Sequence, residues 1–332
     1  MIDLAQKRIL VTGGSGFIAS HLCRRLVKMG SEVAILTKYH SIIDNVRVVD
    51  IWNQLRVVEV DLRNLDSTRR ILDFKPEIIF HLAAYNHVGD SFIHPSEAID
   101  CNLKATVNLI NVLEETPYQR FIYISTSEIY GSQKTCPFEE EMTPNPISPY
   151  AIGKYGGELY TKMMMEQRGR PMTILRPFNA FGPYQSLRAV IPEIMVTCLR
   201  HQPIRATRGV QTREFNFVTN LVDGMILAAS KEEALGKIIN LGCGEEIAIR
   251  TLIETIHELT NSQSTLNFGA LPDRPTEIWR MAAANQRAKE ILGWTPAVSF
   301  REGLQLTLDW FRNFQAVYGE TDSPLMRLAN FG

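Results

Sequence analysis

Short apolar segments alternate with amphipathic segments along the first half of the chain. Runs typical of buried strands lie at residues 8–12, 33–36, 57–60, 78–82, 121–124 and 173–175, and a later one lies at 238–241. Helical spacing of apolar residues appears between them, near 17–29, 66–73, 96–116 and 149–168. This alternation predicts the α/β class, with a doubly wound parallel sheet that has helices on both faces.

The second half of the chain has a different pattern. Prolines gather around 177–192, and helical spacing returns at 250–260 and 301–313. We expect a smaller C-terminal α/β lobe that binds a substrate. The predicted division is 1–178 plus about 218–245 for the sheet domain, and about 179–217 plus 246–332 for the lobe. A ligand is expected between the lobe and the carboxyl ends of the strands.

Composition and charge exclude several classes of protein. The chain has 332 residues, 45% of them hydrophobic, and a formal net charge of -1. No basic excess suggests a nucleic-acid partner, and no apolar run is long enough to cross a membrane. The N-terminus lacks the features of a secretory signal, and the five cysteines lie scattered, without metal-ligand spacing. We expect a cytoplasmic protein with free thiols and no metal site.

A glycine-rich turn follows the first strand, and residues 12–19 read TGGSGFIA. Gly13 permits the tight turn, and Gly16 lets the backbone approach a pyrophosphate at a helix N-terminus, where free N–H groups favour an anion. Ala19 is small enough for the helix to pack on the strand. The strand–turn–helix context predicts a dinucleotide site, whereas a plain loop is the alternative. The expected contacts are Gly13, Gly16, Phe17 and Ile18.

The second strand ends without the carboxylate that usually binds the adenosine ribose of NAD. Thr37 and Lys38 stand there instead, and both can contact a 2′-phosphate, which favours NADP. The alternative is that Lys38 is an ordinary solvated lysine. Asp61 follows the third strand and is expected near the adenine, although it can equally cap the next helix. The sequence therefore predicts NAD or NADP and leaves the choice open.

A tyrosine–lysine pair opens a predicted helix. Tyr150 and Lys154 are four residues apart, so they share one face. An ammonium group and a nicotinamide cation favour tyrosinate and lower the pKa of the tyrosine, which makes Tyr150 a candidate general base. This spacing is common by chance. It gains weight from the segment with Thr126, Ser127 and Glu128, which lies just past a core strand.

Five motifs in this order make the chain resemble a known family. They are the TGGxGF turn, HLAA at 81–84, STSEIYG at 125–131, SPYAIGK at 148–154 and RPFNAFGP at 176–183. The set is similar to the extended short-chain dehydrogenases/reductases of the NAD-dependent epimerase/dehydratase family, which act on nucleotide sugars. The resemblance covers nearly the whole chain. It implies a Rossmann domain that binds NAD(P) tightly and a C-terminal domain that binds a nucleotide-diphosphate sugar.

The resemblance also implies roles for individual residues. Thr126 is expected to hydrogen-bond the reacting 4-hydroxyl group of the sugar. Tyr150 is expected to be the base, and Lys154 to hold the nicotinamide ribose. Further cofactor contacts are expected at Leu62, Leu82, Ala83 and Ala84.

Substrate contacts are expected on the lobe and after the fourth strand. The resemblance points to Arg213 and Arg274 on the nucleotide side. Guanidinium groups suit a diphosphate because they bind it bidentately, although each arginine can instead form a surface ion pair. His87 is expected to line the sugar site or to be structural. The remaining expected contacts are Ser91, Asn179 and, in an apolar wall near the nucleotide base, Val190.

Glu128 distinguishes branches of the family. Simple 4-epimerases usually lack a carboxylate there, whereas 4,6-dehydratases and UDP-glucuronate decarboxylases have glutamate. In a dehydratase this residue removes the C5 proton after C4 is oxidised, water leaves across C5–C6, and the hydride returns to C6. Ser127 replaces the aspartate acid of glucose-type dehydratases, so Glu128 can serve both steps.

We therefore predict an NDP-hexose 4,6-dehydratase, a lyase. The alternatives are a 4-epimerase, then a decarboxylase, and Glu128 can also be a plain loop carboxylate. A cofactor-binding sensor without activity would be expected to lack Thr126, Tyr150 or Lys154, and all three are present.

The helices predicted near 96–116 and 149–168 carry more apolar residues than one core face needs. Leu103 and Val107 are examples on the first helix, and Leu159 and Met163 on the second. In the family, these helices resemble the pair that forms an intersubunit four-helix bundle, so we expect a homodimer. The alternative is that both helices only cover the sheet.

Overall fold

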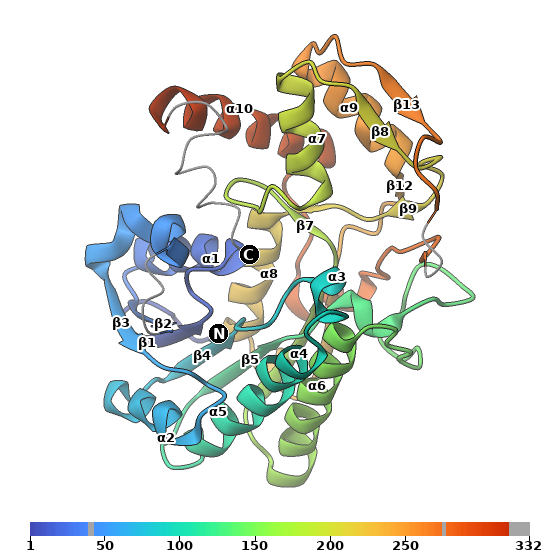
Figure 1. The fold of residues 1–332 in the computed structure, drawn as a ribbon. Coiled ribbons are helices and arrows are strands. Elements are labelled where there is room, and N and C mark those ends of the chain that lie inside the picture. Colours follow the sequence, from blue (N-terminus) through green and yellow to red (C-terminus); the bar gives the residue numbers. More distant parts are fainter. Residues whose placement is uncertain (39–42, 274–276, 319–332) are drawn as a thin grey trace.

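A seven-stranded parallel sheet lies at the centre of the computed structural model, which describes residues 1–38, 43–273 and 277–318 (Figure 1). The strand order is β11-β6-β5-β4-β1-β2-β3. The order reverses between β1 and β4, so their carboxyl ends border the crevice where such sheets bind ligands. The predicted α/β class and doubly wound parallel sheet are confirmed. The strands are β1 (Arg8–Thr12), β2 (Glu32–Thr37), β3 (Leu55–Glu59), β4 (Ile78–His81), β5 (Arg120–Ile124), β6 (Met172–Pro177) and β11 (Ile238–Leu241).

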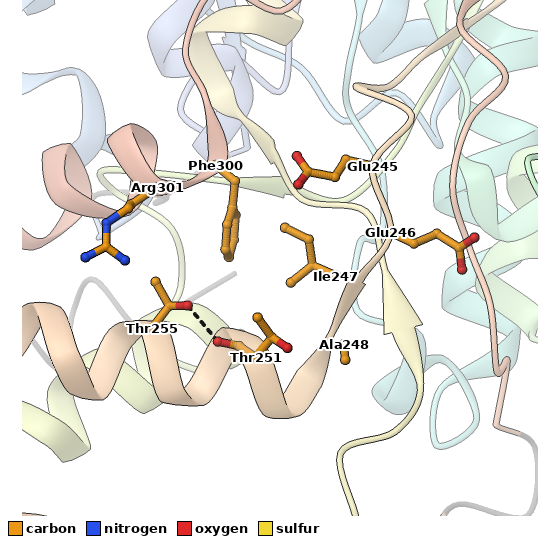
Figure 2. Close-up of a pocket in the computed structure, with 8 residues that line it drawn as sticks. All are labelled: Glu245, Glu246, Ile247, Ala248, Thr251, Thr255, Phe300 and Arg301. Carbon is orange, nitrogen blue, oxygen red and sulfur yellow. Dashed lines mark hydrogen bonds between the residues drawn. The ribbon is translucent and has the colours of Figure 1, made fainter.

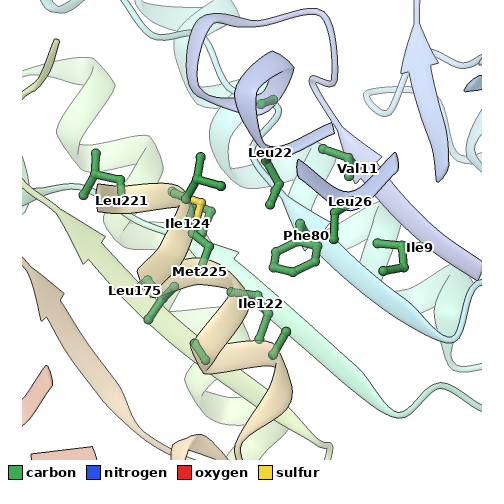
Figure 3. Packing of buried hydrophobic residues seen from close by; sticks show 14 of the residues in the cluster. Ile9, Val11, Leu22, Leu26, Phe80, Ile122, Ile124, Leu175, Leu221 and Met225 are labelled. Carbon is green, nitrogen blue, oxygen red and sulfur yellow. The ribbon is translucent and has the colours of Figure 1, made fainter. Parts of the chain in front are cut away.

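Both faces of the sheet are buried. On β1, Ile9 and Val11 belong to one hydrophobic cluster and Leu10 to another, because successive side chains point to opposite faces. Helices α1 (Phe17–Lys28) and α8 (Val218–Ser230) cover the first face, where Leu22 and Met225 join the cluster (Figure 3). Helices α5 (Ala105–Leu113) and α6 (Pro149–Arg168) cover the second face, with α2 (Leu65–Thr68) beside α5.

Helix α6 begins and ends where its sequence signals predict. The Ser148 hydroxyl accepts a hydrogen bond from the Ala151 backbone N–H at 3.1 Å, and Pro149 occupies the first turn. Gly169 ends the helix with φ of +61°, a left-handed conformation that glycine adopts readily. This start places Tyr150 in the first turn of a firmly capped helix.

The helix expected over 96–116 consists of three pieces. Helix α4 (Pro95–Ile99) leads into a π-helix (Asp100–Lys104) and then into α5, and a short helix α3 (Val88–Ser91) precedes them. Asn102 in the π-helix is buried, and its side chain bonds the Tyr85 backbone N–H and carbonyl at 2.7 and 3.1 Å. The interruption therefore lets the helix hold the loop that follows β4.

A third cluster of buried residues forms the lobe seen above the sheet in Figure 1. The helices expected at 250–260 and 301–313 are α9 and α10. Trp294, expected in the lobe, packs instead with α8 in the cluster on the sheet. The lobe elements are β7 (Ala180–Phe181), α7 (Val190–Leu199), β8 (Ile204–Ala206), β9 (Thr212–Arg213), β10 (Asn216–Phe217), β12 (Ile247–Ala248), α9 (Ile249–Thr260), β13 (Leu266–Phe268) and α10 (Phe300–Tyr318).

A segment that we call the strap, residues 182–189, connects β7 to α7 and contacts the sheet domain at both ends. Near its start, the Pro183 carbonyl lies 2.9 Å from His21 of α1, and Arg47 donates to the Tyr184 carbonyl at 2.8 Å. Near its end, both terminal nitrogens of Arg188 donate to the Asp90 carboxylate of α3 at 2.8 Å. The strap thus joins the helices that follow β1 and β4, on the two sides of the crevice.

Across the described ranges, no helix is both long enough and apolar enough to span a bilayer.

Candidate active site

The glycine turn after β1 is shaped by close contacts. Gly13 has φ of +68°, and a Cβ there would lie 2.9 Å from the Ala83 Cα atom. Gly14, to which the sequence analysis gave no role, packs so tightly that a Cβ would lie 2.3 Å from Ile35 Cγ2. Gly16 precedes α1 without a side-chain cap, so the first N–H groups of the helix have no side-chain acceptor there. This open, uncapped helix start fits the pyrophosphate of a dinucleotide.

A buried hydrogen-bond chain fixes the loop after β4, which carries Leu82, Ala83 and Ala84. The Ala83 N–H donates to the Thr12 hydroxyl at 3.0 Å, and that hydroxyl lies 2.7 Å from His81 Nδ1. His81 Nε2 lies 2.9 Å from the Thr106 hydroxyl, which itself donates to a carbonyl. His81 Nε2 must therefore carry the proton. Burial lowers the pKa of His81 to about 3, so the ring is neutral.

The expected adenosine end lies at the carboxyl ends of β2 and β3. Thr37 is buried, and Lys38 is exposed. The Asp61 carboxylate accepts hydrogen bonds from Arg63 Nε at 3.0 Å and Nη2 at 2.7 Å. The side chain that caps α2 is Asn64, which accepts from the Ser67 N–H, so the alternative that Asp61 is the cap is wrong. Leu62 is buried beside this site.

Thr126, Glu128 and Tyr150 come together at the carboxyl end of β5. Burial raises the pKa of Tyr150 to about 12, the Thr126 hydroxyl counteracts this through a hydrogen bond, and the nearby Glu128 carboxylate adds to it. The expected lowering by Lys154 is therefore not observed. Lys154 instead donates to the Ile124 carbonyl at 2.5 Å, and burial dominates the pKa of the tyrosine.

The turn after β5 presents its two polar residues differently. A 3₁₀ turn (Ser127–Tyr130) begins there, and the Thr126 hydroxyl caps it by accepting from the Glu128 N–H at 3.2 Å. Glu128 is half-buried. Ser127 is buried, and its hydroxyl contacts the Met281 sulfur at 3.6 Å. Of these two residues, Glu128 is therefore the one that lies near Tyr150.

The expected sugar-side residues lie on α3. His87 begins this helix, and its Nδ1 accepts from the Asp90 N–H at 3.0 Å. The Ser91 hydroxyl donates to the Val88 carbonyl at 2.6 Å. Both side chains thus have structural contacts, and α3 packs against α6, the helix that carries Tyr150 in its first turn.

The expected nucleotide-side residues lie on the lobe. The Asn179 side-chain amide donates to the Glu214 carbonyl at 3.1 Å, and Val190 opens α7. Arg213 Nη2 lies 2.6 Å from the Glu277 carboxylate, so this guanidinium has an ionic partner. Arg274 lies outside the described residues.

Two buried carboxylates near the site were missed by the sequence analysis. Glu158 pairs with Arg176 beneath Lys154. Glu214 accepts hydrogen bonds from the backbone N–H groups of Cys243, Gly244 and Ala283, and burial raises its pKa to about 7. The only sequence signal for Glu158 is its position four residues after Lys154 on one helix face.

A pocket of about 310 Å³ lies elsewhere on the lobe, between β12, α9 and the start of α10 (Figure 2). Phe300 and Ile247 point toward each other there, and the Thr255 hydroxyl donates to the Thr251 carbonyl at 2.7 Å. None of the predicted site residues lines this pocket.

Comparisons with known proteins agree with this geometry. The GDP-mannose 4,6 dehydratase family matches residues 10–307. The chain belongs to this family. The resemblance inferred from the motifs, to extended short-chain dehydrogenases/reductases of the epimerase/dehydratase type, is thereby confirmed.

The relatives differ in the activity that their names give. A dTDP-D-glucose 4,6-dehydratase of Bos taurus is 32% identical, over 93% of this chain and 90% of its own. A UDP-glucose 4-epimerase of Mycolicibacterium smegmatis is also 32% identical, over 92% of this chain and 99% of its own. A UDP-glucuronic acid 4-epimerase of Bacillus cereus, solved with UDP-glucuronic acid and NAD, matches with a TM-score of 0.84 and 27% identity, covering 92% of this chain and 99% of that one. The family is thus shown, and identity alone does not separate its reactions.

Proposed function

We propose that the chain is an NAD(P)-dependent NDP-hexose 4,6-dehydratase. The observation that carries the proposal is the Glu128 carboxylate, which lies close enough to Tyr150 to raise its pKa and follows Thr126 by two residues. A base for C5 and a base for the 4-hydroxyl thereby stand at one sugar ring. A simple epimerase needs only the second of these groups.

The side chains divide the proton transfers between them. Thr126 holds the 4-hydroxyl group, and Tyr150 removes its proton. The pKa of Tyr150, about 12 in the protein alone, must fall for this step, and the positive charge of an oxidised nicotinamide ring would act in that direction. Glu128 then removes the C5 proton, which the C4 ketone makes acidic, and passes it to the C6 hydroxyl, which leaves as water. A proton that balances the one taken up by Tyr150 returns to C5 when hydride is added at C6. Bound NAD(P) supplies hydride acceptance at C4 and hydride return at C6, so the cofactor is unchanged overall.

The product separates the candidate reactions. The purified protein is incubated with UDP-, GDP- and dTDP-hexoses, with UDP-glucuronic acid and with either nicotinamide cofactor, and the sugar products are weighed by mass spectrometry. Loss of water supports the dehydratase. An unchanged mass with inverted stereochemistry at C4 identifies the 4-epimerase, which the equally similar epimerase relative favours as second candidate. Loss of carbon dioxide from a uronic acid substrate identifies a decarboxylase.

The choice of cofactor depends on Lys38. No carboxylate ends β2, and Arg63 neutralises Asp61, so the exposed Lys38 is available to a 2′-phosphate. The NAD held by the Bacillus cereus epimerase keeps NAD as the alternative. Calorimetric titration with NAD⁺ and NADP⁺ measures the preference. Lys38→Ala should weaken NADP⁺ binding more than NAD⁺ binding, and equal weakening would contradict this role.

The nucleotide sugar is proposed to bind between the lobe and the sheet, with Asn179, Arg213 and Arg274 on the nucleotide side. Arg213 is preorganised by Glu277 and by the Ile278 carbonyl, to which it donates at 2.5 Å. A guanidinium held in this way can still present its remaining N–H groups to a diphosphate. The proposed domains are those expected from the sequence, with the 288–294 segment transferred to the sheet domain.

We also propose a homodimer formed through α6. Ile152, Leu159 and Met163 are 49%, 48% and 38% exposed, and their spacing places them on one stripe of the helix. On the other predicted helix, Leu109 and Leu113 are fully buried against the sheet, and Leu103 and Val107 are half-buried. Light scattering should therefore give about twice the chain mass of 37.6 kDa at micromolar concentration.

A further inference from the structure

A buried ion pair lies beneath the catalytic residues. Glu158 is on α6, one turn after Lys154, and Arg176 is on β6. Their side chains are 3% and 4% exposed, and Arg176 Nη2 lies 2.6 Å from Glu158 Oε1. Buried charges destabilise a fold unless they are paired and hydrogen-bonded. The contacts of this pair therefore show what it holds in place.

The pair joins α6 to both ends of the segment that carries Thr126. The Ser125 hydroxyl, directly before Thr126, donates to Glu158 Oε2 at 2.5 Å. At the other end of the segment, Arg176 Nη1 donates to the Tyr130 hydroxyl at 2.7 Å. The position of this segment relative to α6 thus depends on two charged side chains that are themselves almost fully buried.

Lys154 lies beside the pair: it is one helix turn before Glu158, and it bonds the carbonyl of Ile124, the residue directly before the Ser125 that bonds Glu158. Its side chain is buried, its Nζ atom donates to the Ile124 carbonyl at 2.5 Å, and it lies 4.5 Å from the centre of the Tyr123 ring. Burial lowers the pKa of Lys154 to about 7, and the Glu158 carboxylate acts against this by raising it. The ammonium form is therefore close to being lost at neutral pH.

The other groups around Lys154 do not replace Glu158. On β4, His81 is neutral, because burial lowers its pKa to about 3. On β5, burial holds the pKa of Tyr123 well above its usual value. On α6, Tyr150 has its pKa raised to about 12, and the neighbouring Glu128 contributes to that rise. Within the described residues, Glu158 is the carboxylate that supports the Lys154 ammonium.

We propose that Glu158 and Arg176 are a positioning pair for Lys154. The carboxylate keeps this buried lysine in the ammonium form that binds the cofactor ribose, and the guanidinium limits the strength of that support. The two residues therefore set the pH range in which the cofactor binds. This inference rests on the proposed function, because it takes Lys154 as a cofactor ligand.

The test is the dissociation constant of NAD⁺ and of NADP⁺, measured by calorimetry on the full chain between about pH 5.5 and pH 9.5, a range that spans the lowered pKa of Lys154 of about 7. Affinity should fall as pH rises and Lys154 loses its proton. Lys154→Met tests whether Lys154 causes this loss of affinity, because the variant should bind the cofactor weakly and with no dependence on pH. If wild type binds neither cofactor, the proposed function fails. If the loss of affinity with rising pH persists in Lys154→Met, this inference fails while the proposed function stands.

Substitutions of the two members of the pair should shift the pH at which cofactor affinity falls, and in opposite directions. Glu158→Gln should move it to lower pH by about one unit or more, since neighbouring charges shift a pKa by about one to three units. Arg176→Gln should move it to higher pH, because the Glu158 carboxylate then acts on Lys154 without a neighbouring guanidinium. A purely structural role would weaken binding in both variants at every pH. That outcome, or shifts in the same direction, would overturn the proposal.

Two further variants control for charge and for folding. Glu158→Asp retains the carboxylate, so the pH of the fall should stay within about half a unit of wild type while binding is weakened only modestly. Glu232→Gln removes the ionic partner of Arg120, which is buried at the amino end of β5. Lys154 contacts the opposite, carboxyl end of that strand through the Ile124 carbonyl. Its pH profile should match wild type. A shift in Glu232→Gln as large as in Glu158→Gln would contradict a local effect.

Discussion

Glu128→Gln changes the proton chemistry of the site with little change in its shape. Glutamine has the same number of heavy atoms, and the cap of the turn uses the backbone N–H of residue 128, 3.2 Å from the Thr126 hydroxyl. The turn should therefore persist. An amide cannot accept the C5 proton, so elimination should lose the contribution of a general base, about 100- to 10,000-fold in rate.

Oxidation at C4 should survive this substitution. Burial is the main reason that the pKa of Tyr150 lies at about 12, and the Glu128 carboxylate adds to it. Removal of this negative charge lowers the pKa of Tyr150 and so favours its base form. The variant should therefore start the reaction and fail to eliminate water.

The assay uses an NDP-hexose that the wild-type protein dehydrates, in deuterium oxide. Glu128→Gln should develop the absorbance of reduced nicotinamide, with little dehydrated product and little deuterium at C5. Tyr150→Phe is the control and should show neither change. If Glu128→Gln exchanges the C5 hydrogen at the wild-type rate, Glu128 is not that base. The preference for a dehydratase over an epimerase then loses its main support.

Three further predictions follow from single contacts. Gly13→Ala places a Cβ 2.9 Å from Ala83 at φ of +68°, so it should lower the free energy of unfolding by about 1–3 kcal/mol in urea titrations and weaken NAD(P) binding. The neutral, buried His81, whose pKa lies at about 3, adds stability that is lost as pH falls below the ordinary histidine pKa. The free energy of unfolding should thus fall by about 2 kcal/mol between pH 7 and pH 5, and His81→Asn should remove this part of the slope. Leu159→Lys, at 48% exposure on α6, should give a monomeric mass in light scattering with unchanged cofactor affinity, and an undisturbed dimer would exclude this stripe as the interface.

The sheet could be predicted closely because its strands are short apolar runs with sharp boundaries. β1 occupies residues 8–12 as expected, between Lys7 and Gly13, and β11 also has its expected limits. Helices α7 and α8 were not predicted. Both are apolar around most of their circumference, since they pack between other elements, and such helices lack the polar face that periodicity detects. Strands of two or three residues, such as β8 and β9, are too short to carry any pattern.

The proposed catalytic group could be predicted because its members lie on two short motifs. Tyr150 and Thr126 come together in the structure, since one motif opens α6 and the other follows β5. The supporting contacts could not be predicted in the same way. Thr12 and His81 are 69 positions apart, and Ser125 and Glu158 are 33 apart. Only the packed sheet brings these side chains together, so no local spacing indicates them.

The strap has a consequence for how the protein exchanges small molecules with its surroundings. Because residues 182–189 are tied to α1 at one end and to α3 at the other, a dinucleotide lying along the crevice has this segment across its exit. Release then requires the Asp90–Arg188 pair or the contacts at Tyr184 to open first. These contacts would slow the exchange of a cofactor bound in the crevice, in keeping with the tight binding expected from the sequence.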